Sequence, residues 1–578
     1  MSGFKVEPFR FTPGQVDAWG RLDPKHRNWP VVYALDDESR VYVGQTSSAL
    51  SRLRQHLAND VKRTLTRARI VIDDEFNQSV CLDLESHLIG WFAGEGRLSP
   101  LNGNGGMSGA DYFDRARYRE MFKDVFEALR SEGLFSHDIE WIQNQDLFKL
   151  SPFKALTDDQ RVAVFDLVSG LFERLERGID STSVIEGGPG TGKTVVAIFL
   201  MKLLADIRDA ADGAEPPDGD SLFSDFFLEG YREVLHDFRM ALVVPQQSLR
   251  ASVKRVFSKT PGLSPGMVLT PFQVGESDQP FDLLIVDEAH RLGQRAAQPF
   301  PALNTKFVAI NERLFGGDDR TITQLDWVRA QSAHRLLLLD REQSIRPSDL
   351  PSRTLDGLVA TARAEHSHYT LTTQMRVRAG EDYIGYARAL VSNTPPADRR
   401  YFADYELALF DDFGAMQDAI VAKDRSDGLA RCVAGFAWPW TTKGVGGDPS
   451  SYDIELDGRR LRWNVKPVDW INSSGSLHEM GSIHTVQGYD LNYAGVVIGP
   501  DLRLDAPSGR LRIDRDSYFD TRGKANNGML GITYSDDDLL VFISNVYGVL
   551  LTRGIRGTYV YVCDPVLRAR FRRLMASR

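Results

Sequence analysis

The sequence has few cysteines and no long apolar run, and each absence excludes a class of protein. Its three cysteines, Cys81, Cys432 and Cys563, lie far apart in a chain of 578 residues, so neither a disulfide framework nor a zinc-ligand spacing is present. No apolar stretch approaches the roughly 18 residues that span a bilayer, and the opening MSGFKVEPFR lacks the apolar core of a signal peptide. We therefore expect a cytoplasmic protein without a membrane partner.

An excess of positive charge is also missing. The chain holds 69 Lys and Arg against 79 Asp and Glu, a net charge of −10, which argues against a protein that coats nucleic acid by charge alone. A local basic groove remains compatible with this total, because binding depends on where the charges lie. The hydrophobic share of 42% is that of a globular protein.

From about residue 156, apolar runs alternate with helical segments, which predicts an α/β fold with parallel sheets. Strands are expected at 183–186, 241–244, 283–286, 335–339, 494–498 and 559–562. An acidic stretch at about 206–232 and a polar stretch at about 443–476 interrupt the pattern and are expected to be solvated insertions. Before residue 156, the sequence predicts a strand pair at 31–35 and 41–44, a basic helix at 51–69 and a second helix at 80–92.

A phosphate-binding motif follows the strand expected at 183–186. It fits the pattern G-x-x-x-x-G-K-[ST] and consists of Gly187, Gly188, Pro189, Gly190, Thr191, Gly192, Lys193 and Thr194. Glycines let backbone N–H groups converge on phosphate oxygens, and the following helix adds its N-terminal dipole. Lys193 is expected to reach the β- and γ-phosphates and Thr194 to bind Mg²⁺, so ATP and Mg²⁺ are the predicted cofactors. A dinucleotide fingerprint is excluded, because its third glycine would fall on Lys193.

Two carboxylates follow the apolar run at 283–286. Asp287 and Glu288 would lie at the carboxyl end of a parallel strand, where ligands bind in open α/β sheets. Asp287 is expected to hold Mg²⁺, directly or through water. Glu288 is expected to polarise the attacking water.

Further segments occur beside these motifs in the order found in superfamily-1 helicases. They are Leu156–Gln160, Val243–Gln246, Leu339–Gln343, Leu371–Arg376, His484–Asp490 and Leu550–Gly554. With Trp438-Pro439-Trp440 and the acidic insertion, the chain most resembles the Schlafen-type (group 3) helicase-like ATPases.

This resemblance implies two RecA-like lobes at 156–350 and 351–578. It also implies that the nucleotide is contacted by Gln160, Gln343, Gln487 and Gly488, and that Arg376 and Arg553 stabilise the transferring phosphoryl group.

The N-terminal residues resemble another family. Tyr33, Tyr42, Arg52, His56, Glu85 and Asn102 follow the layout of GIY-YIG endonucleases, although the first motif reads VVY and only eight residues separate the two tyrosines. The resemblance implies a small α+β nuclease domain at 1–130, joined by a connector at 131–155. Glu85 would hold Mg²⁺ or Mn²⁺ and Arg52 would neutralise developing charge. Tyr33, with Tyr42, would assist water activation, and His56 would orient or shuttle a proton.

Basic residues concentrate in the segment that follows the second strand of this domain. They are Arg52, Arg54, Lys62, Arg63, Arg67 and Arg69. Beside a nuclease centre, we expect them to form a phosphate-binding face on the predicted helix.

Together these motifs predict an ATP-dependent nucleic-acid translocase or helicase fused to a metal-dependent endonuclease. Its partner is expected to be nucleic acid, DNA rather than RNA, in a setting such as anti-phage defence. Two alternatives remain open from the sequence. In one, the ATPase is a regulatory sensor that gates the nuclease without separating strands. In the other, the chain is a non-catalytic nucleic-acid binder that nucleotide switches between conformations.

Overall fold

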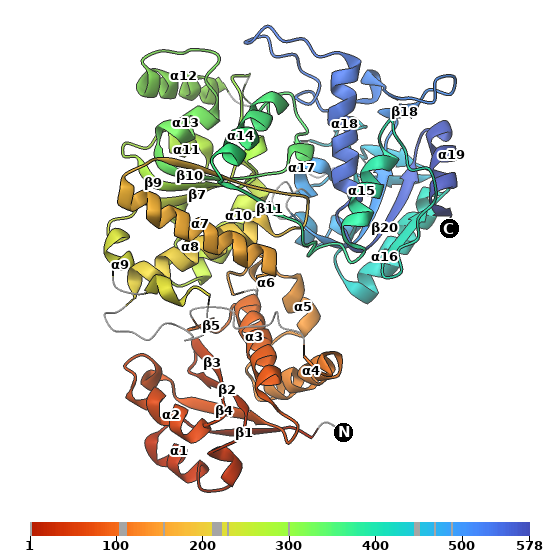
Figure 1. Cartoon of the computed structure of the whole chain (residues 1–578). Coiled ribbons are helices and arrows are strands. Elements are labelled where there is room, and N and C mark those ends of the chain that lie inside the picture. The colour runs from red at the N-terminus through yellow and green to blue at the C-terminus, as the bar shows by residue number, and fades with distance from the viewer. Residues whose placement is uncertain are drawn as a thin grey trace. The chain divides into compact units, whose positions relative to one another are not determined.

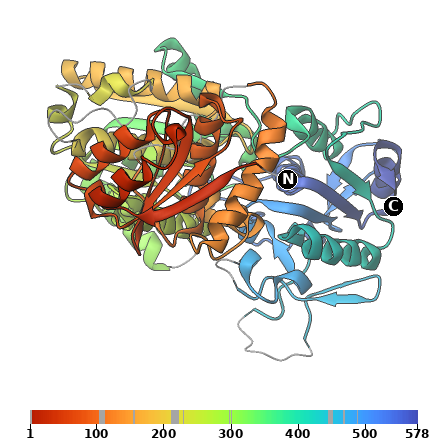
Figure 2. The same cartoon turned by 90° about the horizontal axis from the view of Figure 1, so that it is seen from below.

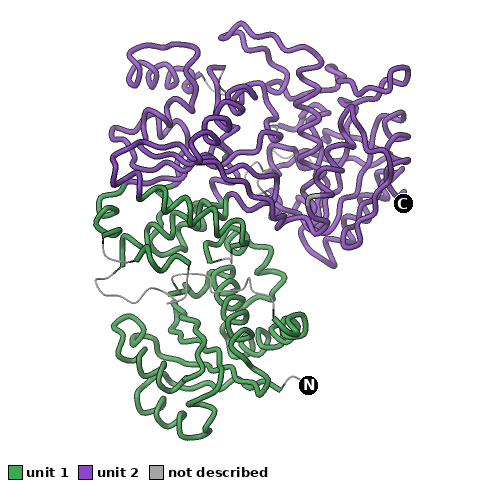
Figure 3. Tube along the Cα trace, in the orientation of Figure 1, with its two compact units in different colours: residues 1–172, 194–238, 252–267 green, residues 173–193, 239–251, 268–578 purple. Residues whose placement is uncertain are grey.

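The computed structural model describes residues 3–102, 112–153, 156–210, 222–227, 230–296, 298, 301–443, 451–466, 470–486 and 489–577. Figure 1 and Figure 2 show the chain in two views. It forms two compact units (Figure 3): unit 1 comprises residues 1–172, 194–238 and 252–267, and unit 2 comprises residues 173–193, 239–251 and 268–578. The domain boundaries expected from the motifs remain predictions. Within the described ranges, no helix combines the length and the apolar character that crossing a membrane requires.

Unit 1 begins with a five-stranded sheet in the order β1-β4-β2-β3-β5. Its strands are β1 (Lys5–Arg10), β2 (Val31–Asp36), β3 (Arg40–Thr46), β4 (Arg67–Ile72) and β5 (Ser99–Pro100). The predicted strand pair is the antiparallel β2–β3 hairpin, in which Tyr33 lies opposite Gly44. β2 also pairs with β4 in antiparallel fashion, so it is a central strand whose six residues are all buried.

Alternation along β2 sends neighbouring side chains to opposite faces of this sheet. Val32 and Ala34 pack in a core with α3 (Gln78–Glu95) and α4 (Arg115–Ser131). Tyr33, on the other face, packs in a core with α1 (Pro13–Trp19) and α2 (Ala49–Ala58). The strand register therefore turns Tyr33 towards the helix that carries Arg52 and His56.

The helix predicted at 51–69 is wrong beyond its first half. α2 ends at Ala58, where Asn59 is extended and its side chain accepts the N–H groups of Val61 and Lys62. A 3-10 turn at Lys62–Thr64 follows, and Arg67 and Arg69 lie on β4, where both pair with Asp36. The alternating RARIVI segment favours a strand there. The expected phosphate-binding face therefore does not include Arg67 or Arg69 as helix residues.

Unit 2 holds two six-stranded parallel sheets, as the alternating pattern predicts for the α/β class. The first has the order β11-β6-β10-β9-β7-β8 and the second β16-β13-β17-β20-β12-β21. The strands of the first are β6 (Ser181–Gly187), β7 (Met240–Val243), β8 (Val268–Leu269), β9 (Phe281–Val286), β10 (Ser332–Leu339) and β11 (His368–Leu371). Those of the second are β12 (Glu406–Leu409), β13 (Ala430–Ala434), β16 (Met480–Ser482), β17 (Leu491–Ile498), β20 (Gly554–Val562) and β21 (Ala576–Ser577). Five of the six predicted strands fall within these elements, and the sixth, predicted at 241–244, extends one residue beyond the end of β7 at Val243.

Further elements connect or flank these sheets. The helices are α5 (Ile139–Asn144), α6 (Asp146–Lys149), α7 (Asp158–Arg177), α8 (Lys193–Asp209), α9 (Tyr231–Val234), α10 (Gln247–Lys259), α11 (Pro271–Gly275), α12 (Pro301–Phe315), α13 (Gln324–Ala330), α14 (Ser352–Ala364), α15 (Gly380–Leu390), α16 (Phe413–Asp427), α17 (Ile483–Val486), α18 (Asp536–Leu551) and α19 (Pro565–Leu574). Two small antiparallel ribbons pair β14 (Ile454–Leu456) with β15 (Arg459–Leu461) and β18 (Leu502–Leu504) with β19 (Leu511–Ile513).

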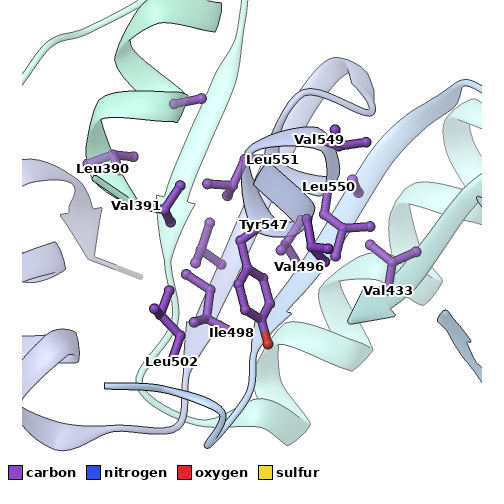
Figure 4. Packing of buried hydrophobic residues seen from close by; sticks show 14 of the residues in the cluster. Leu390, Val391, Val433, Val496, Ile498, Leu502, Tyr547, Val549, Leu550 and Leu551 are labelled. Atoms are coloured by element: carbon purple, nitrogen blue, oxygen red, sulfur yellow. The ribbon is translucent and has the colours of Figure 1, made fainter. Parts of the chain in front are cut away.

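The second parallel sheet is covered on both faces, so all eight residues of its strand β17 are buried. On one face Val433, Val496 and Ile498 pack with α18 and α15, as Figure 4 shows around Tyr547. On the other face Cys432 and Val497 pack with α16.

The first parallel sheet also packs one of its faces within unit 2. Val243, Val286 and Leu337 lie in a core with residues of α11, α13 and α14. Because β6, β9 and β10 run parallel, their carboxyl ends lie at one edge of the sheet. The residues that follow these three strands include the P-loop, Glu288 and Asp340, so the topology gathers them at that edge.

The core around α18 contains one buried carboxyl group. Asp501 is 1% exposed and accepts the Tyr547 hydroxyl at 2.5 Å, while the Gly499 N–H donates to the same hydroxyl at 2.9 Å. Burial raises the pKa of Asp501 from 3.8 to about 7. The native state therefore holds a proton that the unfolded chain releases, and this stabilisation is present below about pH 4 and lost as the pH rises to about 7.

We expect Asp501→Asn to remove this pH dependence, because an amide accepts the same hydrogen bond without a charge to bury. Relative to wild type, the variant gains stability between about pH 4 and pH 7, by at most about 1.4 kcal/mol per pH unit, and keeps the gain above. Thermal unfolding at several pH values measures this difference. The exposed Asp516→Asn serves as control, and an unchanged pH profile in Asp501→Asn would contradict the assignment.

Candidate active sites

The P-loop joins β6 to α8, and its lysine side chain binds backbone oxygens of the same loop. Lys193 is 6% exposed, and its ammonium group donates to the backbone oxygens of Gly187 at 2.7 Å and Gly188 at 3.0 Å. Gly190 and Gly192 have φ angles of 85° and 79°, in the region that favours glycine. The motif's glycines are thus needed for the turn itself, and its lysine lies inside the loop where a phosphate group would be bound.

The segment after β11 lies directly on this loop. The Gln374 side chain donates to the Pro189 backbone oxygen at 2.7 Å, and the Met375 N–H donates to the Gly190 oxygen at 3.0 Å. A methyl group on Gly190 would overlap the side chains of Gln374 and Arg376. These contacts bring the arginine of the 371–376 motif to the P-loop, although the two are about 180 residues apart in the sequence.

Glu288 is oriented by His290, which sequence reasoning did not single out. The Asp340 N–H donates to His290 Nδ1 at 3.2 Å, so the imidazole carries its proton on Nε2, which lies 3.1 Å from the Glu288 carboxylate. Burial opposes the charge of Glu288, but His290, Arg291 and Lys193 outweigh it and hold the pKa of this carboxyl well below its usual range. Glu288 is therefore ionised at neutral pH, and Asp287 beside it is fully buried.

Two arginines of the second half of unit 2 lie close to each other at this site, and Arg553 is within electrostatic range of Glu288. Arg376 pairs with Asp490 at 2.5 Å, and Arg553, 2% exposed, donates to the Tyr489 backbone oxygen at 3.3 Å. Burial, and next the charge of Arg376, lower the pKa of Arg553 to about 9, against the opposing effect of Asp490 and Glu288. Both predicted arginines thus converge near the predicted carboxylate, and Asp490 is a further participant.

Gln343 occupies a neighbouring polar cluster. It is 3% exposed and donates to the Asp340 carboxylate at 2.8 Å, and Arg388 approaches the same oxygen at 3.5 Å. Because the Asp340 N–H also meets His290, Gln343 is linked to Glu288 through Asp340 and His290. A movement of the Gln343 side chain is therefore able to shift the Glu288 carboxylate through Asp340 and His290.

The chemistry of this site fits a nucleoside triphosphate. Four cationic side chains, Lys193, Arg291, Arg376 and Arg553, are largely buried there against the carboxylates of Asp287, Glu288 and Asp490. Among the residues that the structure describes, no acceptor lies within hydrogen-bonding distance of Arg553 Nε. Buried donors and an excess of buried positive charge are stabilised by an anionic ligand such as a phosphate chain.

Four other predicted nucleotide contacts, Gln160, Thr194, Gln487 and Gly488, are not among the described residues of unit 2. Gln160 and Thr194 belong to unit 1, where Gln160 is fully buried and accepts the Thr157 N–H at 3.1 Å. Thr194 is the second residue of α8. Gln487 and Gly488 lie outside the described residues, so their contribution stays a prediction.

The predicted nuclease residues meet in unit 1. The Tyr33 hydroxyl and His56 Nε2 are 2.8 Å apart, and the centroid of the Tyr42 ring lies 6.2 Å from that of Tyr33 and 5.0 Å from that of His56. Lys62 lies over the Tyr42 ring at 3.6 Å. The Asn102 amide spans the backbone of Val43, accepting its N–H at 3.1 Å and donating to its oxygen at 2.7 Å.

The electrostatics of this cluster keep its two central groups uncharged. Burial, then the charges of Lys62 and Arg52, lower the pKa of His56 to about 3. Burial raises the pKa of Tyr33 well above its usual value, and Tyr42 and Glu85 add to the rise while Arg52 opposes it. The neutral imidazole is thus able to accept a hydrogen bond from the neutral phenol, with Arg52 and Glu85 near enough to influence both.

Gly44 has a role that the sequence did not reveal. A methyl group at this position would overlap the Tyr33 hydroxyl and ring. Only a glycine on β3 leaves room for the phenol to reach His56. The sequence contains this glycine in the motif Tyr42-Val43-Gly44. The need for a glycine becomes clear only from the strand register, which places Gly44 opposite Tyr33.

The chain is similar to known proteins over the region that holds the P-loop and the two parallel sheets. Residues 180–564, about two thirds of the 578-residue chain, match the family described as Schlafen group 3, DNA/RNA helicase domain. An uncharacterized protein of Saccharomyces cerevisiae is 26% identical across 68% of this chain and 83% of its own length.

Two solved helicase structures align with lower similarity. Arterivirus nonstructural protein 10 (helicase) is 12% identical with a TM-score of 0.27, over 68% of this chain and 62% of that one, so the chain spans less than two thirds of its length. The Bacteroides Pif1 helicase in complex with ADP-AlF3 and ssDNA is 10% identical with a TM-score of 0.23, over 68% of this chain and 91% of that one. The family match covers more than half of the sequence, and the chain belongs to the Schlafen group 3 DNA/RNA helicase domain family.

Proposed function

We propose that the chain is an ATP-hydrolysing nucleic-acid translocase or helicase with an N-terminal metal-dependent endonuclease. The observation that carries the ATPase is the convergence of Lys193, Glu288, Arg376 and Arg553, which come from four separate segments of unit 2. The family's description as a DNA/RNA helicase domain supports nucleic acid as the partner.

In this proposal each ATPase residue has one task. Lys193 leaves the backbone oxygens of the P-loop and binds the β- and γ-phosphates. Glu288, ionised and oriented by His290, polarises the attacking water, and Arg376 and Arg553 stabilise the charge that develops on the γ-phosphoryl group. Mg²⁺, for which Asp287 and Thr194 are the predicted ligands, would neutralise phosphate charge when bound. Gln343 is coupled to Glu288 through its hydrogen bond to Asp340 and the contact of Asp340 with His290.

The nuclease proposal rests on the hydrogen bond between Tyr33 and His56. A neutral His56 accepts a hydrogen bond from the Tyr33 hydroxyl and orients it towards the attacking water, and Arg52 neutralises charge on the scissile phosphate. Mg²⁺ or Mn²⁺ held by Glu85 would supply a Lewis acid for the phosphodiester. The residues fit this chemistry because a carboxylate, a guanidinium and two phenols share one small site.

Duplex DNA is the substrate that we propose for this combination, and restriction of invading DNA is a setting that it suits. A regulatory ATPase that gates the nuclease without separating strands remains the second candidate. ATP hydrolysis that oligonucleotides stimulate favours the translocase, whereas hydrolysis that ignores nucleic acid favours the sensor.

We expect Glu288→Gln to separate nucleotide binding from hydrolysis. The amide keeps the size of the side chain but cannot polarise water as a carboxylate does, so ATP turnover falls by about 100-fold or more while ATP still binds. Phosphate release and binding of a fluorescent ATP analogue measure the two steps. Full activity in this variant would contradict the role of Glu288.

The two arginines give a second prediction. Arg553→Ala and Arg376→Ala each remove charge that faces the transferring phosphoryl group, and we expect ATP turnover to fall by about 1000-fold. The matched control is the exposed Arg353→Ala. Turnover equal to that of Arg353→Ala would exclude either residue from the reaction.

A third prediction concerns the nuclease site. Tyr33→Phe removes the hydroxyl that meets His56, and we expect cleavage of plasmid DNA with Mg²⁺ or Mn²⁺ to fall by about 100-fold while DNA binding persists. Tyr118→Phe, whose hydroxyl donates to the Glu75 backbone oxygen at 3.1 Å in the same unit, is the matched control. Cleavage by Tyr33→Phe at the rate of the Tyr118→Phe control would overturn the site assignment.

A further inference from the structure

An aromatic cluster that the ATPase does not use is formed by the polar insertion predicted at 443–476 together with the segment just before it. Trp463 is fully buried, stacks on Phe436 with ring centroids 5.0 Å apart, and donates its indole N–H to the Trp438 backbone oxygen at 3.3 Å. Trp440 lies next to Phe436 at 6.0 Å and is only half buried. The cluster therefore runs from a buried tryptophan to one that reaches the surface.

Cations accompany the aromatic rings at the surface. Lys443 lies over the Trp440 ring at 5.2 Å, and Arg462 lies over the Tyr452 ring at 6.0 Å. Tyr452 is 45% exposed, and Lys466 is exposed nearby in the chain. We call Trp440, Lys443, Tyr452, Arg462 and Lys466 the Trp440 patch.

The two halves of the patch are held side by side. The Thr441 hydroxyl approaches the Tyr452 backbone oxygen at 3.4 Å, and Asp453 accepts the Thr442 N–H at 2.8 Å and its hydroxyl at 2.7 Å. The Asp453 carboxylate also accepts a hydrogen bond from the backbone N–H of Trp463 at 2.9 Å. These hydrogen bonds of the buried Asp453 carboxylate hold together the two segments that carry Trp440 and Tyr452.

We propose that the Trp440 patch binds single-stranded nucleic acid by stacking bases on Trp440 and Tyr452. Every base has a face that stacks on an aromatic ring, and neighbouring cations bind the backbone phosphates. The ammonium group of Lys443 now lies over the ring that a base would cover, and it is displaced onto an adjacent phosphate. This inference rests on the proposed function, since it names where a strand is held.

The position of the patch connects it to the ATPase. The β14–β15 ribbon, light blue in Figure 2, projects at the edge of the C-terminal half of unit 2. Asn464, two residues before Lys466, accepts the Ser482 N–H at 3.1 Å on β16. β16 leads directly into His484, whose ring lies 6.0 Å from Phe436 and whose Nδ1 accepts a hydrogen bond from Arg346 at 2.8 Å. Arg346 follows Gln343 by three residues. A nucleic-acid strand bound at the Trp440 patch would therefore be connected to the proposed ATP site through Asn464, His484 and Arg346.

Fluorescence anisotropy of labelled oligo(dT) and oligo(U) with the full chain tests the proposal. Trp440→Ala and Tyr452→Ala are each expected to weaken binding by about tenfold, and Trp440→Phe to retain most of it. In the double variant Lys443→Glu/Lys466→Glu, the slope of log Kd against log salt concentration is expected to shrink by about 0.7 for each phosphate that a lysine no longer neutralises. Comparison of the two oligonucleotides tells DNA from RNA preference.

The control is Phe315→Ala, which removes an exposed aromatic ring at the end of α12. Thermal unfolding identifies any variant that fails to fold, and Tyr452→Ala and the double lysine variant then decide the result. Wild-type binding that all patch variants retain would overturn this inference alone. Absence of binding by the wild type would overturn the translocase proposal with it.

Discussion

Burial of positive charge around one carboxylate is the interaction on which the ATPase half of the molecule depends. Arg376 and Arg553 lie beyond the first parallel sheet in sequence, yet they meet Glu288 and Lys193, which follow its strands. Desolvation makes this arrangement costly unless anions accompany it, as the lowered pKa of Arg553 shows. Asp490 offsets part of the cost by pairing with Arg376. In the proposed ATPase, a phosphate chain would offset the rest, so that nucleotide binding and the approach of the two halves would stabilise each other.

Burial also governs the N-terminal site, but there it keeps the central groups neutral. Tyr33 and His56 carry no charge, and only their neighbours Arg52, Lys62 and Glu85 are charged. The alternation of a central strand places Tyr33 opposite α2, and Gly44 leaves the space that the phenol fills. On the proposed function, such a site would become reactive only when a charged substrate and a metal ion enter it.

Much of this was predictable from the sequence, for physical reasons. Apolar runs specify buried strands, so the six strands predicted in the α/β region agree with observed strands to within one residue at their C-terminal ends, and glycine-rich and carboxylate motifs mark the ends of two of them. Contacts made across the fold were not predictable in this way. His290 acquires its role through a backbone N–H fifty residues away, Asp490 through its pairing with Arg376, and Gly44 through a register. The error at 51–69 had a local cause: the basic residues of 62–69 resemble a helix in composition, while Asn59 and the alternation of β4 end it.

The central claim is that one chain couples ATP hydrolysis to DNA cleavage. The most direct measurement incubates the purified full chain with plasmid DNA and Mg²⁺, with and without ATP, beside Lys193→Ala and Glu85→Ala. The account predicts cleavage that Glu85→Ala abolishes and that ATP alters only when Lys193 is intact. Cleavage that persists in Glu85→Ala, or that responds to ATP equally in Lys193→Ala, would contradict it.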